Sequence, residues 1–65
     1  MIYERVKTIA DMRGMSLASL EREAKISNGT IGKWKDAEPG ARNLFRVAKV
    51  LGVDINILLE GTDKT

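Results

Sequence analysis

The stretch "GMSLASLEREAKISNGTIGKWK" at residues 14–35 decides the fold, because it holds two short helical patterns with almost nothing between them. Ser16 is suited to cap a first helix over Leu17–Ala24, and Ser27 is suited to cap a second one. Only two residues separate the end of the first helix from Ser27. So short a connection forces the second helix to leave at a steep angle, which predicts a helix-turn-helix unit with an exposed second helix.

The helix starts in this stretch follow a pattern that occurs three times along the chain. Each consists of an apolar residue, a capping residue and a further apolar residue five positions after the first, as in a hydrophobic staple. The three sets are Met15, Ser16 and Leu20; Ile26, Ser27 and Ile31; and Val53, Asp54 and Leu58. They predict helices beginning directly after the three caps.

The flanking sequence adds a helix on either side of the central stretch. Residues 2–13 place apolar side chains on one face, and Gly14 follows as a left-handed end residue. Another helix runs from about Ala41 to Gly52, and a last one covers about Ile55 to Glu60. Their predicted buried residues are Ile2, Val6, Ile9 and Ala10 in the first and Leu44, Val47, Ala48 and Leu51 in the second. No stretch alternates as a strand would, so we expect a compact all-α fold of five short helices.

The exposed second helix of the unit contains two glycines, each of which costs roughly 1 kcal/mol in a helix interior. Thr30, Ile31 and Trp34 share the predicted inner side, so we expect Trp34 to be a core anchor. The outer side holds Asn28, Gly29, Gly32 and Lys33, with Lys35 at its margin. A glycine face lets a partner approach the backbone closely. The alternative is that Gly29 lies early in the helix, where glycine costs little, and that Gly32 is merely tolerated.

Composition excludes several classes of protein. The 65 residues include no cysteine and no histidine, which removes the usual nucleophile, general base and zinc ligands. We therefore expect no enzyme activity, no metal and no cofactor. No apolar run approaches the roughly 18 residues that cross a bilayer, and no signal pattern precedes the first helix, so we expect a cytoplasmic protein without membrane contact.

Charge is unevenly distributed, although the net charge is only +2. Residues 25–46 carry five basic side chains against two acidic ones. They are Lys25, Lys33, Lys35, Arg42 and Arg46 against Asp36 and Glu38. The excess lies around the two glycines and favours an anionic partner there, whereas the alternative is an ordinary solvated basic face.

The central stretch, continued by "NLFRVAKVLGVDINILLEG" at residues 43–61, resembles the lambda-repressor-like helix-turn-helix family of phage repressors, Cro proteins and XRE regulators. The likeness covers residues 2–60, and "SNGTIGKWK" is particularly similar to regulators from phages and mobile elements of Gram-positive bacteria. The resemblance implies a five-helix DNA-binding domain over residues 1–61, followed by a polar tail at residues 62–65.

The resemblance also implies which residues contact double-stranded DNA. The second helix of the unit would lie in the major groove, with base contacts from Ser27, Asn28, Gly29, Gly32 and Lys33. Phosphate contacts would come from Ser16, Leu17, Lys35, Arg42 and Asn43. The family acts as dimers on pseudo-palindromic sites, and we place Phe45, Val50, Ile57 and Leu59 at a homodimer interface. The alternative is that these four complete a small core or contact a further domain.

Three residues depart from the family pattern. Leu17 stands where the family often has glutamine, which puts one phosphate contact in doubt. Glu21 stands where a small alanine is usual, and we expect it to reach solvent or a basic partner. Lys25 stands where the turn usually has glycine, so a non-glycine residue is expected at positive φ.

The sequence therefore predicts a DNA-binding transcriptional regulator, with a repressor from a phage or mobile element as the leading hypothesis. One alternative is a protein-interaction module of the same fold, whose partner would be an antirepressor or a toxin. A second is a non-specific nucleic-acid binder. The basic excess favours nucleic acid, and Asn28 with the glycines favours specific readout.

Overall fold

The computed structural model describes residues 2–59, and within them the chain forms four α-helices and one 3-10 helix without any strand. The elements are α1 (Ile2–Met12), α2 (Leu17–Ala24), the 3-10 helix η1 (Ile31–Lys35), α3 (Ala41–Leu51) and α4 (Ile55–Leu59). The predicted all-α class is confirmed, but the third of the five predicted helices is a short 3-10 helix. The predicted last residue of the final helix, Glu60, lies outside the described residues, as does the tail.

One hydrophobic core joins all five elements. Its buried members are Ile2, Val6, Ala10, Leu20, Ala24, Ile31, Trp34, Leu44, Val47, Ala48, Leu51 and Leu58. The predicted stripe of α3 is buried throughout, and three of the four apolar residues predicted for α1 are buried, Ile9 being half-buried. Trp34 is in the core, as predicted. Burying a large apolar side chain contributes about 1.5–3 kcal/mol, so this cluster supplies most of the driving force for folding.

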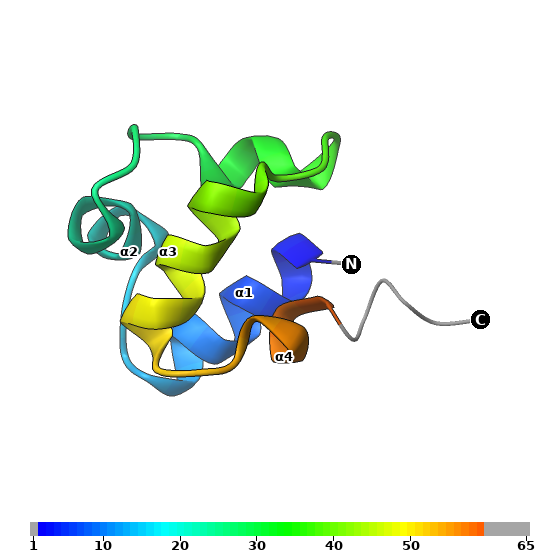
Figure 1. Ribbon diagram of the computed structural model, residues 1–65. Coiled ribbons are helices and arrows are strands. Elements are labelled where there is room, and N and C mark those ends of the chain that lie inside the picture. The colour runs from blue at the N-terminus through cyan, green and yellow to red at the C-terminus, as the bar shows by residue number, and fades with distance from the viewer. Residues whose placement is uncertain (1, 60–65) are drawn as a thin grey trace.

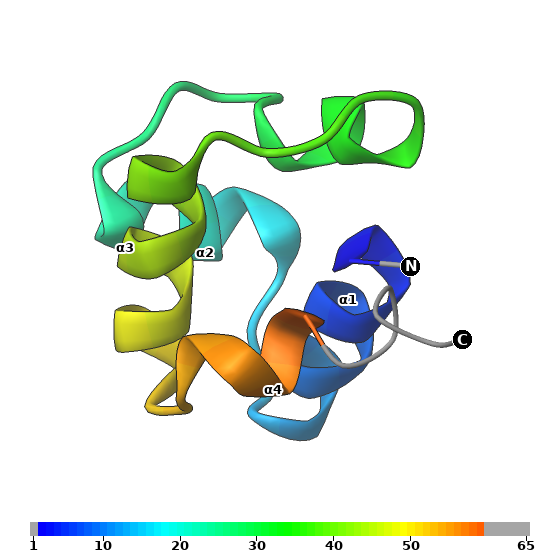
Figure 2. The same ribbon diagram turned by 45° about the vertical axis from the view of Figure 1, so that its right-hand side comes forward.

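The helices are arranged so that one segment stands apart from the body. α2 packs against α3, α1 contacts both α4 and η1, and α4 also contacts α3. Figure 2 shows the chain from the end of α2 to the start of α3 as an upper layer, with α4 at the opposite side of the molecule. Figure 1 shows the same layer at the top of the molecule, above α1. The predicted steep departure of the chain after α2 is thus observed.

The ends of the helices mostly follow the predicted caps. The Ser16 hydroxyl accepts a hydrogen bond of 3.1 Å from the Ser19 N–H, and the Asp54 carboxylate accepts one of 2.8 Å from the Asn56 N–H. Gly14 and Gly52 have φ values of 71° and 74°, the left-handed conformation that commonly ends a helix. Local sequence was therefore sufficient to place these boundaries.

The predicted start of the third helix at Ser27 is wrong. Residues 28–30 form a turn, Thr30 occupies the position before the helix, and η1 begins only at Ile31. The Ser27 carbonyl accepts from the Thr30 N–H at 3.1 Å, but the backbone then turns at Gly29, whose φ is 90°. A residue at that φ cannot belong to a right-handed helix.

The turn after α2 contains the expected non-glycine residue at positive φ, since Lys25 has a φ of 62°. The Lys25 N–H donates to the Arg22 carbonyl at 3.2 Å, and the Ile26 N–H donates to the Glu21 carbonyl at 3.0 Å. Arg46 on α3 donates to the Lys25 carbonyl at 3.3 Å. These bonds hold Lys25 in a conformation that costs a non-glycine residue about 1–2 kcal/mol.

We expect Lys25→Gly to raise the free energy of unfolding by about 0.5–1 kcal/mol, because the relief of strain exceeds the additional backbone entropy of glycine. Lys25→Ala is the matched control, since it removes the same charge but keeps a Cβ. Urea denaturation followed by circular dichroism would measure both. Equal stability of the glycine and alanine variants would contradict strain at this position.

Candidate nucleic-acid interface

Residues 27–35, which we call the projecting segment, lie in the upper layer of the molecule (Figure 2). Its inner side is fixed by Ile31 and Trp34, which are both buried in the core. Its outer side carries exposed residues: Ser27, Asn28, Gly29, Gly32 and Lys33. The five residues predicted to contact bases therefore lie together on one exposed stretch of backbone (Figure 2).

A buried carboxylate fixes the amino end of this segment. Glu21 on α2 is only 4% exposed, and its Oε1 accepts a hydrogen bond of 2.9 Å from the Gly29 N–H. Its Oε2 accepts one of 2.8 Å from the Ile31 N–H. The prediction that Glu21 reaches solvent or a basic partner is wrong, because backbone N–H groups at the start of η1 take the place of a cation. A carboxylate at a helix amino end is also favoured by the helix dipole.

The two glycines of the projecting segment have different roles. Gly29 has a φ of 90°, a conformation that side chains rarely adopt, so the turn itself requires glycine there. The interpretation of Gly29 as a glycine on an exposed helix face is therefore wrong. Gly32 lies within η1, and a Cβ placed on it would meet nothing within 4 Å. Nothing within residues 2–59 requires a glycine at that position, so close approach of a partner stays a prediction, with simple tolerance of the glycine as the alternative.

The predicted phosphate contacts divide into two groups. Arg42 is exposed in the first turn of α3, next to the half-buried Asn43, and no side chain caps that helix because Gly40 precedes it. The N–H groups of an uncapped helix start attract anions. This end of α3 lies beside the projecting segment in both ribbon views (Figures 1 and 2).

The second group of predicted phosphate contacts has other roles within the molecule. Ser16 is exposed, but its hydroxyl oxygen caps α2. Leu17 is half-buried against the core, so only its backbone remains to face a phosphate. The Lys35 ammonium lies 5.3 Å from the centre of the Tyr3 ring, a cation–π contact to α1.

The predicted dimer residues do not form one uniformly exposed patch. Phe45 is 57% exposed, whereas Val50 and Leu59 are half-buried and pack against the core. Ile57 is half-buried as well. Phe45 lines an open groove of about 340 Å³ with Ala48, Lys49, Val53, Asp54 and Ile55. Sequence reasoning missed Met12, which is 76% exposed and is the other exposed large apolar side chain of residues 2–59.

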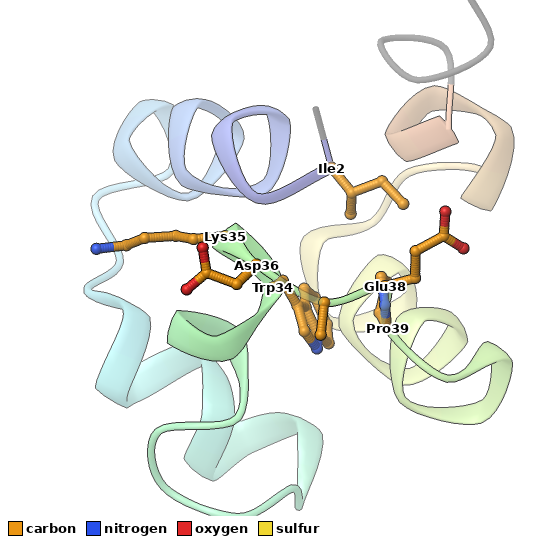
Figure 3. A pocket seen from close by; sticks show the side chains of 7 residues that line it. Ile2, Trp34, Lys35, Asp36, Glu38 and Pro39 are labelled. Atoms are coloured by element: carbon orange, nitrogen blue, oxygen red, sulfur yellow. The ribbon is translucent and has the colours of Figure 1, made fainter.

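A small hollow lies beneath the carboxyl end of η1, where the Trp34 ring and Pro39 face Ile2 (Figure 3). Figure 3 shows the Lys35 and Asp36 side chains extending away on the other side of the chain. The hollow holds about 160 Å³, less than the roughly 300 Å³ usual for a small-molecule site. Within residues 2–59 no three acidic, cysteine or histidine side chains are grouped as metal ligands. None of the helices over the same range has the length and apolarity needed to cross a bilayer.

A short capped helix, a tight turn and a second segment that stands out from the body define a helix-turn-helix domain. The family model described as helix-turn-helix, of the lambda-repressor and XRE type, matches residues 6–58. The chain belongs to that family, whose domains are those of DNA-binding transcription regulators. Neither the curated proteins nor the solved structures gave a significant match.

The different backbone conformations of the two glycines lead to opposite predictions for the same substitution. We expect Gly29→Ala to lower the free energy of unfolding by about 1–2 kcal/mol, because alanine is strained at positive φ. We expect Gly32→Ala to leave it unchanged or raise it by up to about 1 kcal/mol. Thermal denaturation of both variants measures the difference, and equal effects would contradict the turn at Gly29.

Proposed function

We propose that the protein binds double-stranded DNA in a sequence-specific manner, with the projecting segment lying in the major groove, and that it regulates transcription as a repressor. The observation that carries this proposal is the two-sided nature of the segment. Ile31 and Trp34 hold one side in the core, while Asn28, Gly32 and Lys33 are exposed on the other. The major groove is about 12 Å wide and admits one helical segment of this kind.

Base readout would come from three side chains and two glycines. The Asn28 amide suits the N6 and N7 edge of adenine, and the Lys33 ammonium suits guanine O6 or N7. Ser27 offers a hydroxyl that can donate or accept a hydrogen bond. Gly32, with open space around a Cβ placed on it, would let the backbone approach base edges or thymine methyl groups, and the exposed Asn28 directly precedes the turn at Gly29.

Phosphate contacts would fix the position of the segment in the groove. The uncapped start of α3, with Arg42 and Asn43, is the best placed because it lies beside the projecting segment. Lys35 and the start of α2 at Ser16 and Leu17 would add contacts from the other side. Such contacts supply affinity and orientation, whereas the base edges supply specificity.

A domain this small reads only a few base pairs, so we propose a homodimer on a pseudo-palindromic operator with half-sites about 34 Å apart. The exposed Phe45 and the groove beside it offer an apolar surface for pairing. Val50, Ile57 and Leu59, which do not line that groove, are the other predicted members of the interface. The proposed domain extends over residues 1–61. The similarity of "SNGTIGKWK" to regulators of phages and mobile elements supports a role in such an element.

The alternative function is a protein-interaction module of the same fold that binds an antirepressor or a toxin. The exposed Phe45 and Met12 favour it, because large exposed apolar side chains often mark protein contacts. The basic excess around the projecting segment favours DNA. Selection of bound duplexes from a random pool separates the two: a symmetric enriched sequence supports the repressor dimer, binding without enrichment contradicts sequence-specific readout, and duplexes left unbound at low salt contradict DNA binding altogether.

We expect Gly32→Glu to abolish binding to the selected duplex while the fold is retained. A Cβ at this position has open space, but the carboxylate would face the electronegative groove. Thr8→Glu adds the same charge on the exposed side of α1 and serves as the control. Fluorescence anisotropy measures the dissociation constants, and circular dichroism verifies the fold. Unchanged affinity of Gly32→Glu would show that the major-groove assignment is wrong.

Lys33→Ala distinguishes a base contact from a phosphate contact. A base contact predicts a loss of about 1–3 kcal/mol confined to one base pair of the site. A phosphate contact predicts uniform weakening over all sequences. It also predicts that the slope of the logarithm of the binding constant against the logarithm of salt concentration becomes shallower by about one. Titrations of single-base-pair variants at several salt concentrations decide between them. We expect the first result, because Lys33 is exposed and directly follows Gly32 in η1.

A further inference from the structure

We infer that Glu21 is a positioning residue for DNA readout: its buried carboxylate sets the orientation of the projecting segment relative to α2. This inference rests on the proposed function. It assigns a role in specificity to a side chain that does not itself face the DNA. The resemblance to the family implies a small alanine at this position, so it does not supply the contact that Glu21 makes here.

The geometry of the contact is that of a two-point clamp. One carboxylate oxygen accepts from the Gly29 N–H at 2.9 Å and the other accepts from the Ile31 N–H at 2.8 Å. The two N–H groups belong to the residues before and after Thr30. The end of the turn and the start of η1 are therefore bonded to the same planar carboxylate. A single hydrogen bond permits rotation about its axis, whereas two bonds from one carboxylate restrict it.

Burial strengthens the two hydrogen bonds of Glu21, and a substitution there would affect the two backbone N–H groups that it binds. Glu21 is 4% exposed, so water competes poorly for its oxygens. No buried polar side-chain atom within residues 2–59 lacks a hydrogen-bond partner. Glutamine at this position would keep one acceptor but would turn an NH₂ group toward the second N–H. One of the two backbone donors would then be buried without an acceptor, which is unfavourable.

The clamp acts where the proposed base contacts begin. Asn28 directly precedes Gly29, and Gly32 directly follows Ile31, so each anchored N–H group adjoins a residue that we propose contacts a base. Ile31 and Trp34 fix the carboxyl half of the segment through the core, but Asn28 and Gly29 are exposed and have no such anchor. Without the carboxylate, the turn that presents Asn28 would lose its main restraint. Specific contacts need a fixed geometry, whereas non-specific phosphate attraction does not.

The test compares Glu21→Gln with Glu23→Gln, which removes the same charge from an exposed residue of the same helix. Fluorescence anisotropy with the selected duplex and with an unrelated duplex gives the ratio of specific to non-specific affinity. We expect Glu21→Gln to lower this ratio by roughly tenfold relative to Glu23→Gln, since a charge-assisted hydrogen bond is lost. We expect the same variant to accelerate amide exchange at Gly29 and Ile31, measured by NMR, while exchange in α3 is unchanged.

The outcomes separate this inference from the proposed function. If the wild-type protein binds no duplex, both are wrong. If the wild-type protein binds specifically and folded Glu21→Gln keeps the ratio of Glu23→Gln, only the positioning role is wrong. If Glu21→Gln does not fold, amide hydrogen exchange in the wild-type protein tests the positioning role instead. A Gly29 N–H that is protected well beyond that of the exposed Asn28 supports the clamp, and equally fast exchange at the two amides overturns it.

Discussion

The whole arrangement depends on how the second half of the helix-turn-helix is attached to the first. A helix of five residues is too short to be stable in isolation, so η1 exists only because other parts of the chain hold it. Ile31 and Trp34 hold its inner side through the core, and the Glu21 carboxylate holds its amino end. These two attachments leave the opposite side of the segment free for a partner.

The two attachments differ in their physical character: one is apolar burial and the other is a pair of hydrogen bonds. Apolar burial is strong but non-directional, so Ile31 and Trp34 hold the segment against the body without setting its orientation closely. Hydrogen bonds are directional, and a buried carboxylate with two donors defines an orientation. The turn at Lys25 adds a third restraint through Arg46, which donates to its carbonyl from α3. The segment is thus bonded to α2, and the turn that leads into it is bonded to α3.

Much of the fold could be predicted from the sequence because its signals are local. Caps such as Ser16 and Asp54, and left-handed glycines such as Gly14 and Gly52, act within one turn of their own position. The predicted buried stripe of α3 is confirmed for the same reason, since helical period alone places it. The positive φ of Lys25 followed from its place in the turn of a recognised family.

The errors came from a contact between residues that are not neighbours in sequence. Glu21 and Gly29 are eight positions apart, and nothing in the pattern around either one indicates that a carboxylate would satisfy the turn. Ser27 therefore looked like a cap and Gly29 like a helical residue. The base contacts, the phosphate contacts and the dimer surface remain predictions, because they concern molecules other than this chain.

The placement of Lys35 has a consequence for the two cations, Lys35 and Arg42, that we propose as phosphate contacts. Its ammonium lies over the Tyr3 ring, and leaving an exposed aromatic face gives up about 0.5–1 kcal/mol. No contact of the Arg42 side chain is found among residues 2–59. Arg42 lies in the first turn of α3, whose N–H groups receive no hydrogen bond from a capping side chain. The two cations are thus unequal: Lys35 would have to leave the Tyr3 ring before its ammonium could bind an anion elsewhere, whereas Arg42 would not.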